Sequence, residues 1–326
     1  MPIGLFAAMS LTLLLLFGFL FGILAALGYF FAVSGYIVVV MAILLVFIQW
    51  LIGPKVIWWT TNMRLLEKGE YPWIHRAVED LCKRYKVPVP RLALVRSGAP
   101  NAFVFGRRPK SATLAVTQGL LDALTQEEVK GVLAHEIGHI KHKDMVVMTA
   151  VSAIPIIMYF IARFLVFAPR QGERREAGAA ILIGMIAFLL YFVTNLLVLY
   201  LSRLREYYSD RFGGLATKPH NLASALAKIT YGLSLTPSQE KAGAGAAKYF
   251  FIADPLEATG EIARFSSHYA DMHISREEVK EAMEWEKRNP LMKFMEVFRT
   301  HPLTYKRISR LQELEREASK SRIEAT

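Results

Sequence analysis

Four long apolar runs interrupt a chain that is otherwise rich in charged residues. A short uncharged turn joins the first two and a polar loop joins the last two. Each run is long enough to cross a bilayer as one helix, which takes about 20 apolar residues. The pattern predicts two transmembrane hairpins, with helices at about 3–27, 36–52, 145–167 and 179–201. The chain then divides into hairpins at 1–53 and 145–201 and polar segments at 54–144 and 202–326.

A cleaved signal peptide is the alternative interpretation of the first run. It would need a basic stretch before the apolar residues and a shorter apolar core of at most about 15 residues. The run from Ile3 to Leu27 is longer, lacks that basic stretch, and is followed almost at once by a second apolar run. We therefore expect the first run to remain in the protein as a membrane helix.

The polar segment 54–144 mixes helix and strand signals. An amphipathic helix is predicted from Tyr71 to Lys86, and three short strands follow, separated by Gly, Pro and basic turns, at 92–95, 102–105 and 113–116. An edge strand beside a helix is a natural place to bind an extended peptide through main-chain hydrogen bonds. The alternative is a purely structural sheet. We expect the last strand to bind substrate with Thr113, Leu114, Ala115 and Val116.

A buried helix is predicted after this last strand. Thr125 and Glu128 have the spacing of a capping box, in which the two side chains satisfy free amide groups at a helix start. Apolar residues then recur at helical spacing, at Val129, Val132, Leu133, Ile137 and Ile140. Small residues form another face, which a second backbone could approach closely, at Gly131, Ala134 and Gly138.

The same helix carries the motif His-Glu-x-x-His, which holds a catalytic zinc in many metallopeptidases. His135 and His139 lie one helical turn apart, so both imidazoles can be directed at one metal ion. Glu136 lies about 100° around the helix, which suits a carboxylate that holds water instead of the metal. The alternative is a pair of histidines that happens to lie one turn apart in a packed helix.

A third ligand is predicted directly after the fourth apolar run. Two membrane crossings separate Glu206 from the histidine pair, so all three residues lie on the same side of the bilayer. Asp210, one turn further on, can accept a hydrogen bond from the free ring nitrogen of a ligating histidine. The alternative is that Glu206 is a solvated carboxylate beside Arg203 and Arg205.

The composition supports a membrane protein and limits the metal chemistry. Hydrophobic residues make up 53% of the chain and the mean hydropathy is +0.30, which is too apolar for an ordinary soluble protein. The one cysteine, Cys82, excludes an intramolecular disulfide and a cysteine-rich zinc site. Any metal must therefore be held by histidines and carboxylates.

The formal net charge of +11 does not indicate a nucleic-acid partner, because no recognised binding motif accompanies it. In a membrane protein such an excess more often marks the cytoplasmic face. Three arginines in the loop 169–177 weaken this argument, but more basic residues flank the other ends of the hairpins. We therefore expect both polar segments to face the cytoplasm.

The order His135-Glu136-x-x-His139, Glu206-x-x-x-Asp210 and His301-Pro302-x-x-x-x-Arg307 resembles the M48 family of membrane-bound zinc peptidases. Within the family the chain looks like the HtpX-type heat-shock protease more than the Ste24-type CaaX prenyl protease, because it has four predicted spans and not seven. Ser209 stands where the family has alanine. The resemblance also includes Asn101 before the sheet, where we expect substrate binding.

The resemblance implies a mainly α membrane protein, with four transmembrane helices and a zincin-like (gluzincin) α+β peptidase domain built around a small sheet. It implies one zinc ion per chain, with Glu136 as general base and with His301 and Arg307 assisting at the oxyanion. The implied substrates are damaged or misfolded membrane proteins at the cell membrane. Two alternatives remain open: a CaaX-type processing peptidase, and a membrane scaffold with a structural zinc site but no turnover.

Overall fold

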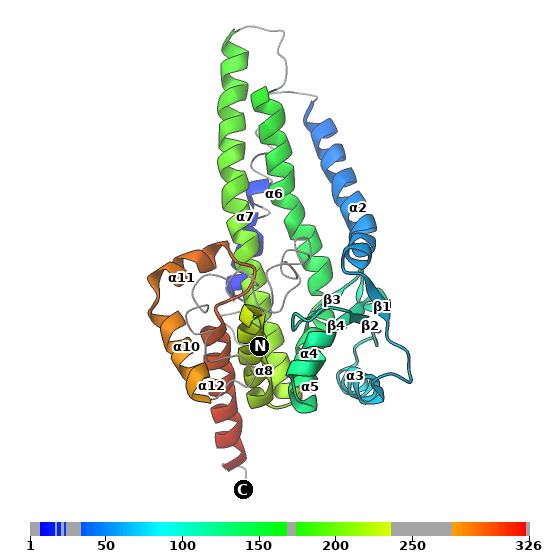
Figure 1. Ribbon diagram of the computed structural model, residues 1–326. Coiled ribbons are helices and arrows are strands. Elements are labelled where there is room, and N and C mark those ends of the chain that lie inside the picture. The colour runs from blue at the N-terminus through cyan, green and yellow to red at the C-terminus, as the bar shows by residue number, and fades with distance from the viewer. Residues whose placement is uncertain are drawn as a thin grey trace. The chain divides into compact units, whose positions relative to one another are not determined.

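The computed structural model describes residues 7–16, 18–20, 23, 34–167, 174–235 and 276–323 (Figure 1). The chain folds as two compact units, each made of two separate stretches. The first unit contains Met1–Gly53 and Val146–Leu204, and the second contains Pro54–Met145 and Arg205–Thr326. Three helices contribute residues to both units, namely α2 (Ser34–Thr60), α6 (Asp144–Phe167) and α7 (Arg174–Ala216).

Two helices among the described residues are long and apolar enough to cross a membrane, over Asp144–Val166 and Ala180–Ala216. The first contains the predicted span 145–167 except residue 167, and the second contains the predicted span 179–201 except residue 179. The predicted span 36–52 lies within α2. Of the predicted span 3–27, the structure describes only residues 7–16, 18–20 and 23. Helix length and composition thus support two of the four predicted spans, and the four-span arrangement is not confirmed.

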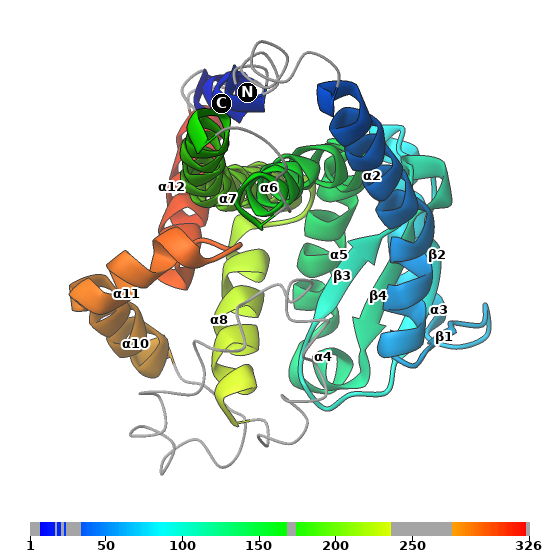
Figure 2. The same cartoon turned by 90° about the horizontal axis from the view of Figure 1, so that it is seen from above.

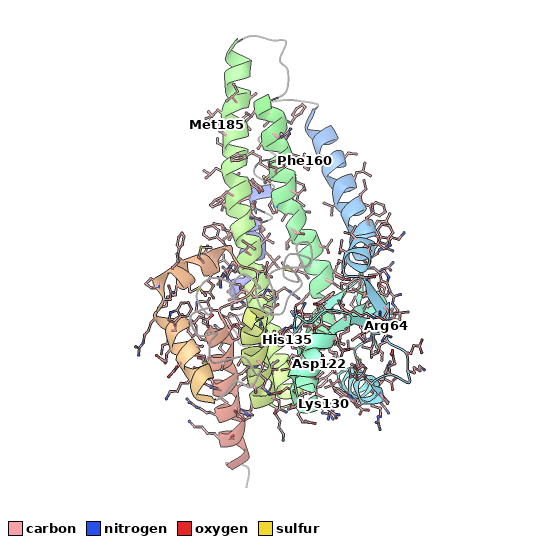
Figure 3. All side chains as sticks on the ribbon, viewed as in Figure 1. Arg64, Asp122, Lys130, His135, Phe160 and Met185 are labelled. Atoms are coloured by element: carbon pink, nitrogen blue, oxygen red, sulfur yellow. The ribbon has the colours of Figure 1, made fainter. Side chains whose placement is uncertain are left out.

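The first unit exposes many large apolar side chains. In Figure 3 the labelled Phe160 on α6 and Met185 on α7 project outward from their helices, and they are 45% and 61% exposed. Between the helices, Met158 and Ile161 of α6 pack with Ile183 and Ala187 of α7. A helix pair that buries one face and exposes apolar side chains on the other is suited to lipid.

The second unit is built on a mixed four-stranded sheet. Its strands are β1 (Met63–Leu65), β2 (Arg91–Val95), β3 (Ala102–Phe105) and β4 (Thr113–Thr117), in the order β1-β2-β4-β3. β4 pairs in parallel with β2 and antiparallel with β3. The three predicted strands are present, whereas the three-residue β1 was not predicted.

The prediction that residues 113–116 form an edge strand is wrong. Thr113, Leu114, Ala115 and Val116 have partners on both sides, so their main chain is already committed within the sheet. All five residues of β4 are buried. A continuous apolar run without polar alternation is typical of an interior strand, which is the physical reason for this position.

Helices cover the sheet on one face and the end of α2 packs on the other (Figure 2). On the first face, Leu94 and Leu114 belong to the same core as α3 (Pro72–Tyr85) and α5 (Gln126–Lys141). On the second face, Ile57 and Trp58 of α2 pack with Ala93, Val95, Phe103 and Ala115. The predicted helix from Tyr71 to Lys86 is confirmed as α3, whose buried residues are Ile74, Val78, Leu81 and Cys82.

The remaining elements of the second unit are mostly helical. They are η1 (Pro109–Ser111), α4 (Gln118–Ala123), α8 (Pro219–Leu235), α10 (Arg276–Arg288), α11 (Pro290–Met295), η4 (Glu296–Phe298) and α12 (Thr304–Ile323). α12 packs on α8 through the same core, to which it contributes Ile308, Leu311 and Leu314. The carboxylate of Glu286 accepts hydrogen bonds from the backbone N–H groups of Thr304 (3.1 Å) and Tyr305 (2.8 Å). Because these amides lie at the start of α12, Glu286 stabilises this helix end.

Candidate metal centre

The start of α5 is fixed by the predicted capping box. The Thr125 hydroxyl accepts from the backbone N–H of Glu128 (3.4 Å), and the Glu128 carboxylate accepts from the backbone N–H of Thr125 (2.8 Å). The same carboxylate accepts from the Ser224 hydroxyl (2.6 Å) and from Lys228 Nζ (2.9 Å) on α8. Glu128 therefore both caps α5 and joins it to a second helix.

Small residues allow α5 and the end of α7 to approach closely. A Cβ atom added at Gly138 would lie 3.2 Å from Ser209 Oγ and 3.1 Å from Phe212. A Cβ atom added at Gly213 would lie 3.0 Å from the backbone nitrogen of His135. The small-residue face predicted on α5 is thus occupied, and this close packing is what brings the polar side chains of α7 to the histidine motif.

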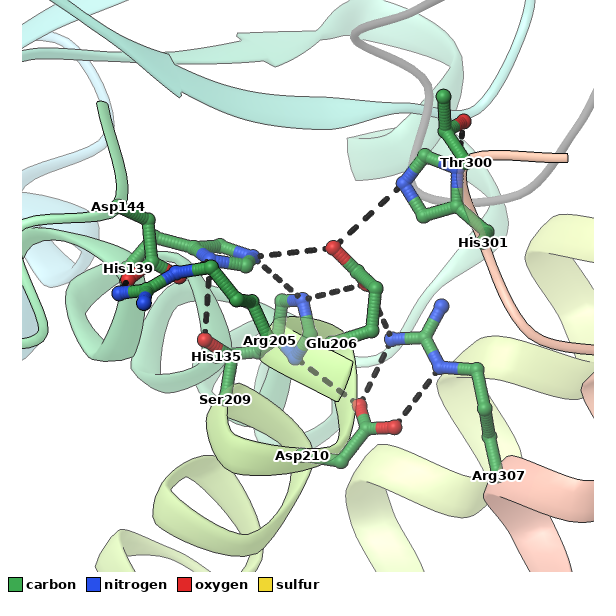
Figure 4. Close-up of polar contacts among 10 residues, drawn as sticks. All are labelled: His135, His139, Asp144, Arg205, Glu206, Ser209, Asp210, Thr300, His301 and Arg307. Atoms are coloured by element: carbon green, nitrogen blue, oxygen red, sulfur yellow. Dashed lines mark hydrogen bonds and ion pairs between the residues drawn. The ribbon is translucent and has the colours of Figure 1, made fainter. Parts of the chain in front are cut away.

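Three ligand-type side chains converge where these helices meet (Figure 4). The Nε2 atoms of His135 and His139 are 3.2 Å apart. Glu206 places Oε2 3.5 Å from Nε2 of His135 and Oε1 3.5 Å from Nε2 of His139. Their side chains are only 1%, 15% and 8% exposed. Two imidazoles and one carboxylate are a donor set that zinc binds in catalytic sites, with one position left open.

A second carboxylate lies close to the same histidines. Donor atoms of His135, Glu136 and His139 all lie within 4.8 Å of one another, so Glu136 also qualifies as a potential ligand. Glu206 fits the ligand role better, because its two oxygens reach the two Nε2 atoms individually at 3.5 Å. Glu136 is then left beside the centre as a carboxylate that is 3% exposed.

Asp210 and Arg307 hold one side of the centre. Asp210 Oδ1 lies 3.0 Å from Nδ1 of His135, on the ring edge opposite the convergent Nε2. Arg307 donates from Nε and Nη2 to the two oxygens of Asp210 (2.8 and 2.7 Å), and its Nη2 is 3.2 Å from Glu206. A carboxylate in this position fixes the orientation of a metal-binding imidazole.

A parallel arrangement holds His139 and was missed by the sequence analysis. Asp144 Oδ2 lies 2.6 Å from Nδ1 of His139, and the Ser209 hydroxyl is 3.0 Å from the same nitrogen. Arg205 forms an ion pair with Asp144 and donates to the backbone carbonyl of His142 (2.8 Å). The sequence signal that could have predicted this contact is an aspartate five residues after the second histidine. This aspartate, Asp144, lies just past the end of α5.

His301 approaches the centre from the segment before α12. Its Nε2 lies 3.6 Å from Oε1 of Glu206, and its Nδ1 lies 2.9 Å from the Thr300 hydroxyl. The structure thus brings His135, Glu136, His139, Glu206, Asp210, His301 and Arg307 together.

The predicted substrate-binding residues lie in or beside the sheet instead. Residues 113–116 are in β4, and Asn101 bonds to Thr117 through its backbone. His142 is the C-cap of α5, with its ring 5.9 Å from that of Tyr208.

Burial and charge shift the protonation of this cluster. Burial raises the pKa of Glu136, although the charges of His139 and His135 oppose the shift. Burial likewise lowers the pKa of His139, which favours the neutral imidazole that binds metals. Burial also lowers the pKa of His135, but hydrogen bonds to Asp210 and Glu206 outweigh it and raise this pKa to about 9. In the absence of metal, these carboxylates therefore stabilise a proton on His135.

The family model and the curated relatives indicate one family, and a solved structure shows a similar fold. The model of peptidase family M48 matches residues 69–315, which include all the side chains of the centre. The chain is 40% identical over 237 residues to "Protease HtpX homolog" of Methanothermobacter thermautotrophicus, covering 71% of this chain and 87% of that protein. It is 30% identical over 320 residues to "Protease HtpX homolog 2" of Methanosarcina mazei, covering 97% of both. The crystal structure of Ste24p from S. mikatae has a similar fold, with a TM-score of 0.53 at 17% identity over 95% of this chain and 67% of that chain.

Proposed function

Because the chain belongs to peptidase family M48 and is a metallopeptidase, we propose that it is a membrane-embedded zinc endopeptidase that hydrolyses damaged or misfolded membrane proteins. One observation carries this proposal: two histidines one turn apart on α5 and a glutamate from α7 converge within 3.5 Å in a buried centre. The relatives named as HtpX homologues, which cover 71% and 97% of this chain, support an HtpX-type peptidase.

His135, His139 and Glu206 would hold the zinc ion, one per chain. When bound, zinc would polarise a substrate carbonyl and lower the pKa of a water in its open position toward neutrality. Two aspartate–arginine pairs keep the histidines in place: Asp210 with Arg307 contacts His135, and Asp144 with Arg205 contacts His139. Both free ring nitrogens are therefore occupied by carboxylates, which leaves the two Nε2 atoms for the metal.

Glu136 is the proposed general base. Its carboxylate accepts the proton of the water that attacks the scissile carbonyl, and then donates this proton to the leaving amine nitrogen. Burial raises the pKa of Glu136, which brings its proton affinity closer to that required near neutral pH. Its carboxylate lies within 4.8 Å of ring nitrogens of His135 and His139, within reach of the centre.

His301 and Arg307 have different roles in this proposal. The side chain of His301 is 12% exposed, whereas that of Arg307 is 2% exposed, and Nε2 of His301 lies 3.6 Å from Glu206, so His301 is the group that would donate to the developing oxyanion. Arg307 is only 2% exposed, donates to Asp210 from two nitrogens and lies 3.2 Å from Glu206, so it stabilises the carboxylates of Asp210 and of the proposed ligand Glu206. This assignment makes Arg307 a positioning residue, whereas the family resemblance suggested a direct part in catalysis.

The proposed topology has four spans in the cell membrane, with residues 54–144 and 202–326 forming one peptidase domain in the cytoplasm. The candidate spans in α6 and α7 and the division into two units support this arrangement. The charge distribution of the sequence supports the orientation. The substrates would be polypeptides, and lipid would be the second partner.

The test uses detergent-purified protein and two substrates, an unfolded protein and a prenylated CaaX peptide. We expect the wild type to cleave the unfolded protein, a chelator to stop cleavage, and Glu136→Gln to be inactive with its fold intact. Cleavage of the prenylated peptide alone would favour the CaaX-type function, with which the fold of Ste24p is compatible. Cleavage by Glu136→Gln would eliminate the assigned base, and no cleavage of either substrate would favour a scaffold.

A further inference from the structure

The short helix α11 and the following turn η4 expose a continuous apolar face. Leu291, Phe294, Met295 and Phe298 follow the spacing i, i+3, i+4, i+7 and are 61%, 61%, 41% and 43% exposed. The rings of Phe294 and Phe298 lie 5.6 Å apart. We call these four residues the α11 apolar face. Its spacing places all four side chains on one side of the segment.

Exposure of this kind is unusual within the second unit. From residue 61 onward in the described part of this unit, the other exposed large apolar side chains are Val297 (40%), which lies in the same segment, and the isolated residues Leu65, Val89 and Leu215. The conformation of α11 is also well defined, because Pro290 is its first residue and the Asn289 side chain accepts from the backbone N–H groups of Leu291 (3.0 Å) and Met292 (3.3 Å). A fixed segment that exposes several large apolar side chains is typical of a binding surface.

The charges around this face indicate which partner it fits. The exposed charged residues from 287 to 299 are all basic, namely Lys287, Arg288 and Lys293. The Glu284 carboxylate lies 3.8 Å from Nζ of Lys287 and 3.6 Å from Nη2 of Arg288, and offsets one of these charges. We call these three basic residues and Glu284 the rim, which has a net positive charge. A second copy that docked with the same face would bring two basic rims together, which is unfavourable. Anionic lipid headgroups complement both the apolar face and its rim.

We propose that the α11 apolar face inserts into the interface of an anionic bilayer, as a contact separate from the membrane-spanning helices. Amphipathic segments of this composition insert to the boundary between headgroups and acyl chains. Phe294 and Phe298 provide the apolar area, and Lys293 provides a charge for the headgroups.

This contact would also hold a segment of the metal centre. Glu296, on the other side of the turn, is 8% exposed and accepts from the backbone N–H of Leu303 (3.3 Å) and from Lys306 Nζ. His301 lies between these anchored positions, three residues after Phe298. Insertion of α11 therefore restricts the segment that carries His301, which couples the membrane surface to the centre.

The experiment places a fluorophore on α11 in the full chain reconstituted into vesicles. Phe294→Cys is labelled with an environment-sensitive dye in a Glu136→Gln background, so the result does not depend on peptidase activity. The native Cys82 is 1% exposed, and the wild-type chain serves as a labelling blank. Val89→Cys, an isolated apolar residue that is 55% exposed, is the matched control. Vesicles of phosphatidylcholine, with or without phosphatidylglycerol, contain lipid spin-labelled near the top of the acyl chain.

We expect the dye at position 294 to shift its emission to the blue and to be quenched by the spin-labelled lipid, and the dye at position 89 to do neither. Phosphatidylglycerol should increase the quenching, and the triple substitution Lys287→Gln, Arg288→Gln and Lys293→Gln should abolish that increase. Emission at 294 equal to that at 89 would overturn the proposal. A blue shift without quenching by lipid would also overturn it, because protein and not lipid would then cover the face.

Discussion

Replacing Arg307 with methionine tests how the centre is stabilised when no metal is bound. Arg307 is 2% exposed, and its guanidinium lies within 3.2 Å of the carboxylates of both Asp210 and Glu206, which are themselves 3% and 6% exposed. Removing one partner of a buried ion pair leaves an uncompensated charge and costs about 3–5 kcal/mol. Here two carboxylates lose their counter-charge, so we expect the upper part of this range.

The assay is unfolding of detergent-purified protein by heat and by denaturant, with and without a chelator. Zinc would supply positive charge beside Glu206, so the loss should be larger in the chelated protein. Arg316→Met, an exposed arginine on the same helix, is the control and should change stability by at most about 0.5 kcal/mol. The double variant Asp210→Asn with Arg307→Met should be less destabilised than the two single variants added together, by about 1–3 kcal/mol.

Equal stability of Arg307→Met and Arg316→Met would refute this account of the ion pair. Strict additivity of Asp210→Asn and Arg307→Met would refute it as well, because it would mean that the two side chains do not interact.

Three further predictions concern the surroundings of the centre. Glu128→Gln should destabilise the protein by about 1–3 kcal/mol at neutral pH. Burial raises the pKa of Glu128, but hydrogen bonds from Lys228, Ser224 and Thr125 outweigh burial and lower this pKa. The stabilisation by the Glu128 carboxylate should therefore be full above pH about 4.3, the pKa of an unfolded glutamate, and fade as pH falls through the folded-state pKa. Unfolding of the wild type and Glu128→Gln between pH 7 and pH 3 measures this dependence. Asp144→Asn should weaken zinc binding by about 10–100-fold, measured by competition with a chromogenic chelator, with Ser209→Ala as the milder comparison. Gly213→Ala should lower the melting temperature more than Gly178→Ala does, because only the former places a Cβ atom 3.0 Å from a backbone nitrogen, whereas the latter meets nothing within 4 Å.

The parts of the fold that could be predicted are those specified by local sequence. The capping box of Thr125 and Glu128, the apolar stripe of α5 and the spacing of His135 and His139 all lie within one helix, where periodicity determines which side chains share a face. The amphipathic α3 was predictable for the same reason.

The parts that were missed depend on long-range pairing. Whether β4 lies at an edge depends on β3 returning to its far side, which the spacing of the strands does not specify, although the continuous apolar run of β4 favours an interior position. The role of Asp144 depends on the turn after α5, where Lys143 has a positive φ of 59° and redirects the chain. The hydrogen bonds from Arg307 to Asp210 depend on where α12 packs, and no local sequence pattern indicates this position.

The central claim is that His135, His139 and Glu206 bind the zinc ion while Glu136 lies beside it as the base. The most direct measurement is the zinc content per chain of purified wild type, Glu206→Gln and Glu136→Gln after dialysis against a weak chelator. We predict one zinc in the wild type and in Glu136→Gln, and a loss of zinc in Glu206→Gln. Zinc retained in Glu206→Gln and lost in Glu136→Gln would contradict the account, because it would exchange the roles of the two carboxylates.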